Sequence, residues 1–320
     1  MKDMTTKSAV LLLVGVLAGI VTVQLLWPLV GEAQGQGQGQ GPAWKLEGTL
    51  PSMEKQVNTY KNVPPDVSQG RLDNLSRAFG MNGRAVGQEV LALDDGDKSL
   101  RLMRGTGAMM YRNHTTAGKA VGSNLPNTGP AGASADKFCR DNNLLPGGSS
   151  RSVEVVTSRS QNQENGPTSS HGAEIAVTYS FKLGGKQVEG PGSKAMVTIG
   201  DGGTVTSFTR TMPDVEAARM VQTKTAAQAY EELKQKGHWN MLKQAGGPPR
   251  EIKVKNVRAA YWVEDPGRGA GTIEPCFIFT GTAVDEDGRD VEFMQKVSAV
   301  EGQAEPTLPA SPTQPSRPQE

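Results

Sequence analysis

The sequence predicts an α+β protein, in which an N-terminal transmembrane helix precedes repeated units of one helix packed on a small antiparallel sheet. Three observations support this class: an apolar run at residues 9–30, three segments with helical spacing of apolar residues, and alternating apolar and polar residues after each of them. The 39 glycines and 20 prolines among 320 residues assign a large share of the chain to turns.

The apolar run at residues 9–30 is long enough to cross a bilayer as a helix, which takes about 20 residues. Lys2 and Lys7 precede it, and no Lys or Arg follows until Lys45, so the positive-inside bias places the N-terminus in the cytoplasm and the bulk of the chain outside. This pattern predicts a single-pass protein of the cell membrane. Alternatively, residues 1–33 are a cleaved secretory signal and the chain is secreted.

Composition divides the rest of the chain. A Gln and Gly segment without apolar residues is typical of a flexible linker, and the Pro-rich C-terminal segment is typical of disorder. Between them a unit of helix followed by antiparallel strands repeats three times. The predicted ranges are 1–33 for the anchor or signal peptide, 34–43 for the linker, 44–130, 131–216 and 217–300 for the three units, and 301–320 for the tail.

Each unit begins with a helical pattern. In the first, Leu72, Leu75 and Phe79 share one face and Gly80 follows as a stop signal. The predicted helices are 67–79, 134–145 and 225–236. The predicted strands are 89–93 and 99–103 in the first unit, 153–156, 175–181, 194–199 and 204–209 in the second, and 252–257, 259–263, 276–284 and 291–300 in the third.

A glycine-rich stretch at residues 184–194, GGKQVEGPGSK, superficially resembles a phosphate-binding loop. Such a loop needs GxxxxGK[ST] between a strand and a helix, but here Pro191 stands where the lysine would be, and a strand pattern follows. We therefore predict a hairpin turn at Gly184 and Gly185 and no nucleotide or other cofactor. The formal net charge of +1, without a basic block, also argues against nucleic-acid binding.

The sequence contains no GxSxG, HExxH or paired Cys and His motif, so no catalytic residue is assigned and a noncatalytic protein is expected. No metal site is assigned either. The nearest approach to one is a cluster of carboxylates around a glycine turn, for which calcium is the fitting ion and a plain hairpin tip is the alternative. These calcium candidates are Asp285, Asp287, Asp290 and Glu292.

Outside the cell, Cys139 and Cys276 could form a disulfide; the alternative is that both are small buried hydrophobic residues. Three aromatic residues, Trp239, Tyr261 and Trp262, are candidates for a contact surface. Because Tyr261 and Trp262 are adjacent on a predicted strand, they should face opposite sides of its sheet. The alternative is that these rings fill the core.

The middle and last units, with YSFKLGGKQVEGPGSKAMVTIGDGGTVTSF and TAAQAYEELKQKG followed by IEPCFIFTGTAVDEDG, resemble PepSY-type domains and the exported portions of YycH/YycI-like regulatory proteins. The resemblance extends over roughly residues 134–300. It implies an extracytoplasmic, noncatalytic regulatory protein that binds an envelope partner such as a peptidase or a sensor kinase. It carries over no catalytic residue.

The leading hypothesis is thus a binding or regulatory protein that acts through contacts at strand edges or sheet faces. A second hypothesis is an exported hydrolase or carbohydrate-active enzyme, whose acid and base would come from Glu174, Asp201, Glu274 and Asp285. A third is a structural subunit of the cell envelope.

Overall fold

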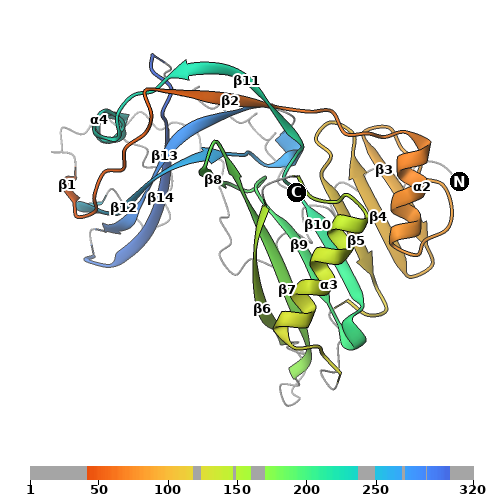
Figure 1. Cartoon of the computed structure of the whole chain (residues 1–320). Coiled ribbons are helices and arrows are strands. Elements are labelled where there is room, and N and C mark those ends of the chain that lie inside the picture. The colour runs from red at the N-terminus through yellow and green to blue at the C-terminus, as the bar shows by residue number, and fades with distance from the viewer. Residues whose placement is uncertain are drawn as a thin grey trace, which may run out of the picture.

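The computed structural model describes residues 42–117, 124–146, 149–159, 170–236, 249–268, 271–285 and 287–302. In this part of the chain, hydrogen-bonded pairing connects fourteen strands into one bent sheet, and three α-helices pack on it (Figure 1). Two sheet regions, each with its own hydrophobic cluster, meet at the bend.

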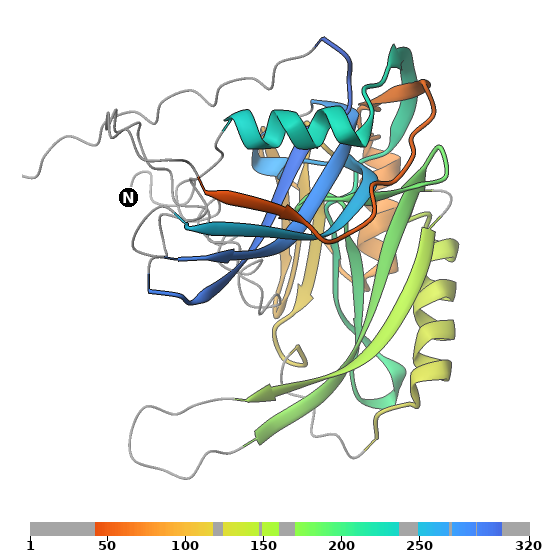
Figure 2. The same cartoon turned by 90° about the vertical axis from the view of Figure 1, so that its left-hand side faces the viewer.

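The first region is antiparallel, in the order β3-β4-β5-β10-β9-β7-β6. Helices α2 and α3 cover one of its faces, and α3 runs along the sheet on the right of Figure 2. The elements are α2 (Gln69–Ala78), β3 (Val90–Asp95), β4 (Lys98–Met103), β5 (Met109–Asn113), α3 (Thr128–Asp141), β6 (Ser149–Arg159), β7 (Ser170–Leu183), β9 (Ala195–Ile199), the 3-10 turn η1 (Asp201–Gly203) and β10 (Val205–Arg210).

The core of this region forms where helix faces meet the alternating side of the strands. Leu72 and Leu75 of α2 and Ala135 of α3 are buried in the same cluster as Phe208 of β10. Phe79, just after α2, stacks on Tyr111 of β5 with ring centroids 4.2 Å apart. Burial of large apolar and aromatic side chains of this kind is the main favourable term in folding.

The second region contains β12, β13 and β14 in antiparallel order, with β1 parallel to β12. The start of β13 also pairs with β2, and β2 pairs with β11. Helix α4 covers one face, and β8 connects the two regions by pairing with β7 and, in parallel, with β12. The elements are β1 (Ala43–Leu46), β2 (Gln56–Asn62), β8 (Lys186–Glu189), β11 (Val215–Gln222), α4 (Ala226–Lys236), β12 (Glu251–Trp262), η3 (Pro266–Arg268), β13 (Thr272–Val284) and β14 (Asp290–Ser298).

The predicted fold class is wrong. A large mixed sheet replaces the small separate sheets, and its strand pairs connect all three predicted units: β5 pairs with β10, β1 with β12, and β2 with β11 and β13. The physical reason is that alternation shows which face of a strand is buried, whereas the identity of the neighbouring strand depends on tertiary contacts. The ranges 44–130, 131–216 and 217–300 stay sequence-based predictions.

The predicted single-pass membrane topology and cell-membrane location also require correction. Among the residues that the structure describes, no helix has both the length and the apolar character of a membrane span. The segment on which that prediction rested, residues 9–30, lies outside the described residues, as do residues 34–41 of the predicted linker and 303–320 of the predicted tail.

Candidate functional site

The glycine-rich stretch at residues 184–194 is a hairpin followed by a close backbone crossing. Gly184 and Gly185 have φ values of +53° and +78°, and they connect β7 to β8 as a two-residue turn. A Cβ on Gly192 would lie 2.1 Å from the carbonyl oxygen of Glu264, so glycine is required where the chain passes the segment that follows β12. The hairpin prediction is confirmed, since the strand β9 follows Lys194.

The two cysteines are free thiols and are not joined to each other, so the alternative to the disulfide describes them. Cys139 is buried between α3 and the first sheet region, whereas Cys276 belongs to a separate cluster on the second region. Burial raises the pKa of the Cys139 thiol to about 12, which keeps it protonated and unreactive at neutral pH. Both cysteines therefore behave as the small buried residues of the alternative interpretation.

The aromatic contact surface is not present at Tyr261 and Trp262, because these side chains are only 1% and 7% exposed. Tyr261 packs in the first cluster and donates its hydroxyl to the carbonyl oxygen of Asn58 at 2.7 Å. Trp262 faces the other side and lies under the ammonium of Lys296, 5.3 Å from the ring centroid. The two rings face opposite sides, as predicted, but they fill the interior; Trp239 lies outside the described residues.

The acidic tip after β13 is held by an arginine. Asp285, 2% exposed, accepts the backbone N–H of Arg289 at 2.8 Å and its Nε at 2.7 Å, and Asp287 pairs with the same guanidinium at 2.9 Å. These hydrogen bonds, first that of the backbone N–H, lower the pKa of Asp285. Asp290 and Glu292 continue into β14, and the described residues contain no metal-ligating group of three or more side chains.

The four carboxylates considered for hydrolysis are not gathered at one point. Glu274 and Asp285 lie at opposite ends of β13, about 35 Å apart at the rise of an extended strand. Glu174 and Asp201 lie at the same end of the first sheet region, because Ile175 pairs with Ile199. The Glu174 carboxylate is buried and accepts the hydroxyl of Thr206 at 2.8 Å.

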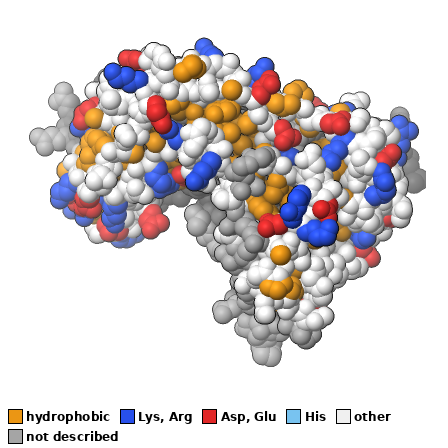
Figure 3. All heavy atoms as spheres, in the orientation of Figure 1, with side chains coloured by type: hydrophobic (Ala, Val, Ile, Leu, Met, Phe, Trp, Pro, Cys, Tyr) orange, Lys and Arg blue, Asp and Glu red, His pale blue; other side chains and the backbone are white. Residues whose placement is uncertain are grey.

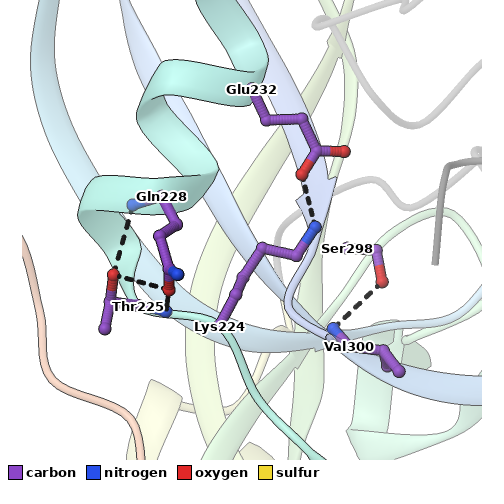
Figure 4. A network of polar contacts seen from close by, with 6 residues as sticks. All are labelled: Lys224, Thr225, Gln228, Glu232, Ser298 and Val300. Atoms are coloured by element: carbon purple, nitrogen blue, oxygen red, sulfur yellow. Dashed lines mark hydrogen bonds and ion pairs between the residues drawn. The ribbon is translucent and has the colours of Figure 1, made fainter. Parts of the chain in front are cut away.

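A polar network that the sequence interpretation missed fixes the start of α4 (Figure 4). Thr225 and Gln228 form a reciprocal capping box, and the T-x-x-Q spacing could have predicted it. The nearly buried Lys224 forms an ion pair with Glu232, about two turns further along the chain in α4, and its backbone N–H donates to the carbonyl oxygen of Ala299 at 2.8 Å. With its charges paired, this network holds α4 against the end of β14.

Strand β11 is a largely exposed element at one end of the strand order. It pairs only with β2, and six of its eight residues are exposed. Met220 is 62% exposed, unusual for a large hydrophobic side chain here. Figure 3 shows hydrophobic side chains among charged ones along this upper side of the molecule, where β2 and β11 run in Figure 1.

The outward positions of β11 follow from the hydrogen bonds that bracket it. The carbonyl oxygen of Asp214 accepts the backbone N–H of Val63 at 2.8 Å, and the backbone N–H of Thr223 donates to the carbonyl oxygen of Lys55 at 3.0 Å. The backbone groups of Asp214 and Thr223 are therefore directed toward β2. The register shifts by a bulge between Ala217 and Met220. By alternation on either side of that bulge, the groups directed away from β2 belong to residues 215, 217, 220 and 222.

Other ends of the sheet are covered or differently built. At β3, Val86 exchanges two hydrogen bonds with Ala92, at 2.9 and 2.8 Å, and so covers the middle of that edge. At the far end of β11, Glu301 donates to the carbonyl oxygen of Gln222 and limits the open edge to residues 215–220. We call residues 215–220 the β11 edge.

No family model matches the chain, and no curated protein matches it. Among solved structures, an uncharacterized protein from Eubacterium rectale is similar, with 10% sequence identity, a TM-score of 0.43, and coverage of 81% of this chain and 88% of that one. At this level of similarity, the comparison assigns neither a family nor an activity.

Proposed function

We propose that this protein is a noncatalytic binding or regulatory protein, and that it takes an extended segment of a partner protein onto the β11 edge. The observation that carries the proposal is the exposure of this edge strand. Native proteins usually shorten, cover or charge such strands, because an open edge recruits other chains. Here Met220, Ala217 and Ala218 leave apolar side chains on an open strand.

Recognition at the β11 edge would follow the chemistry of strand addition. The partner's backbone would exchange hydrogen bonds with Val215 and Ala217 before the bulge or with Met220 after it, and side chains on alternate positions would supply selectivity. Glu216 is paired with Lys61 of β2 at 3.0 Å, so the exposed Arg219 would favour a segment with an acidic residue near it. The partner classes that the PepSY-like resemblance implies, a peptidase or a sensor kinase, are the first to test.

The decisive experiment compares two substitutions at Ala217, whose N–H is directed away from β2. Ala217→Pro removes this donor without removing a bond to β2, whereas Ala217→Thr keeps it. A photo-crosslinking amino acid at position 220 of the full chain identifies the partner, and calorimetry with the purified partner measures affinity. We expect Ala217→Pro to weaken binding at least about tenfold and Ala217→Thr to change it little. Equal affinities for both variants would refute strand addition here.

A hydrolase remains the second candidate, favoured by one observation: Glu174 and Asp201 lie at the same end of one sheet. General acid and base catalysis needs two carboxylates at one site. Loss of a measured hydrolytic activity on ester, peptide or glycoside substrates in both Glu174→Gln and Asp201→Asn would support this candidate, and it would contradict the noncatalytic proposal.

A further inference from the structure

A second open edge lies on β14 and has a different construction. All nine residues of this strand pair with β13 in one constant register, from Cys276↔Ser298 to Val284↔Asp290, without a bulge. Within the described part of the chain, β13 is the only strand that pairs with β14. An unbroken edge of nine residues is about 30 Å long, which suits pairing with a complete second strand.

The backbone groups of β14 that point outward can be assigned. The backbone N–H of Asp285 donates to the carbonyl oxygen of Arg289 at 3.0 Å, and that of Ala299 donates to the carbonyl oxygen of Pro275 at 2.9 Å. The hydrogen-bonded pairs at the two ends of the β13–β14 ladder therefore involve odd-numbered residues on the β14 side. Because such pairs alternate, the even-numbered residues from 290 to 298 direct their N–H and C=O groups away from β13. The carbonyl of Lys296 accepts the side-chain amide of Gln295 and has a second lone pair available.

The side chains at these outward positions form a pattern that is complementary to itself. Glu292 and Lys296 lie two residues on either side of Met294. We propose that β14 pairs antiparallel with β14 of a second copy of this chain, around a two-fold axis at Met294. In this register Glu292 of each copy lies directly opposite Lys296 of the other, and the two Met294 residues face each other.

The surroundings of β14 support this register. Lys296 is already oriented by Glu264 and by the Trp262 ring, so its ammonium lies on the same face as the exposed Glu292. Met294 is half-buried on the cluster of that face, and Phe293 is half-buried on the α4 face. Pairing would cover both apolar side chains and would place α4 of both copies on the same face of one continuous sheet.

Other registers of the β14–β14 pair are either less favourable than the one centred on Met294 or can be told apart from it by experiment. Centring the pair on residue 292 or 296 places like charges opposite each other, which is destabilising. Centring it on Phe293 moves Asp290 opposite Lys296 and leaves Glu292 opposite Met294. Reversal of charge at Glu292 and at Asp290 therefore separates the two attractive registers. The outward edge of β14 is a different strand edge from the β11 edge, so the inference does not depend on the proposed function.

The test is sedimentation velocity of the full chain at about 1 to 100 μM, the range in which a micromolar dimer dissociates. We expect a dimer of twice 33.9 kDa for the wild-type chain. Glu292→Lys should raise the dimer Kd about 30-fold or more, because it places lysines opposite each other at two symmetric positions. The control Asp290→Lys has the same change of charge on the same strand and should alter Kd by less than about threefold.

The charge exchange Glu292→Lys with Lys296→Glu restores opposite charges across the axis and should recover most of the lost affinity. A wild-type chain that stays monomeric would overturn the proposal. So would a dimer that Asp290→Lys disrupts as strongly as Glu292→Lys does, or one disrupted by Ala217→Pro in β11. Circular dichroism of each variant shows that its monomer is folded, since the exposed Glu292 packs in no core.

Discussion

Two arginines hold the end of α3 in place and supply the sharpest stability prediction. Arg71 of α2 donates to the carbonyl oxygens of Asn142 and Asn143 at 3.0 and 2.8 Å, and Arg210 of β10 donates to that of Leu144 at 3.2 Å. Asn142 is the C-cap of α3 and the other two residues follow it, so the guanidinium groups lie at the C-terminus of the helix, where cations complement its dipole. Burial, and then the nearby charge of Arg210, lower the pKa of Arg71.

Replacement of Arg210 by methionine keeps the apolar stem and removes the guanidinium. The buried carbonyl oxygens of Leu144 and Met212, which Arg210 contacts at 3.2 and 2.7 Å, then lose their charged donor. Each such bond contributes about 1.5–3 kcal/mol, and the longer one contributes less. Asp214 is half exposed, so its ion pair with Arg210 adds little. We expect Arg210→Met to lower the free energy of unfolding by about 3 kcal/mol.

Urea unfolding followed by circular dichroism measures this loss of free energy, provided that its dependence on urea concentration has the same slope in the wild-type chain and the variant. The control is Arg77→Met, which removes a guanidinium from the exposed side of α2 and should cost less than about 0.5 kcal/mol. An Arg210→Met variant as stable as the control would refute the role assigned to these bonds.

Three further outcomes are expected. In a double-mutant cycle of Lys224→Met with Glu232→Gln, the nearly buried ion pair should give a coupling free energy of about 1–2 kcal/mol, measured by urea unfolding. Burial raises the pKa of the folded Cys139 thiol to about 12, so the thiol of the unfolded chain loses its proton at a lower pH than the folded one. The free energy of unfolding should therefore fall as the pH rises above about 8.5. Cys139→Ala should flatten this part of the pH profile of stability. Gly281→Ala should destabilise the folded protein by about 2 kcal/mol or more in thermal unfolding, because the added Cβ would lie 1.9 Å from a backbone oxygen of β12. The control Gly129→Ala places a Cβ in open space on α3 and should stabilise the folded protein by about 0.5 kcal/mol.

Local patterns predicted the helices well where caps and periodicity agree. The predicted helix at 225–236 differs from α4 by one residue, because Thr225 is the capping residue. The predicted helix at 134–145 begins six residues after the first residue of α3, Thr128, whose N-cap is Asn127. Pro130 lies in the first turn of α3, where a missing N–H costs nothing.

Local sequence patterns could not predict the two candidate edges, for a physical reason. The β11 sequence VEAARMVQ does not alternate, because only its first residue, Val215, packs against a core cluster and pairing with β2 holds the rest of the strand. Strand β2 was missed as well, although Val57 and Thr59 alternate with exposed residues, because its partners lie more than 150 residues away along the chain. The sequence therefore predicted the β14 strand but not that its outer side is open.

The two proposed surfaces meet at one corner of the fold. Thr223 forms a bridge with Val300, Glu301 donates to Gln222, and Lys224 donates to Ala299, so the ends of β11 and β14 are hydrogen-bonded to each other. A partner strand that orders β11 and a second copy that orders β14 would therefore act on the same backbone. Linkage requires such coupling to be reciprocal: if dimerisation tightens partner binding by some factor, the partner tightens dimerisation by the same factor. Comparison of partner affinity between the wild-type dimer and a Glu292→Lys monomer measures that factor. Equal affinities would mean that dimerisation and partner binding are not coupled.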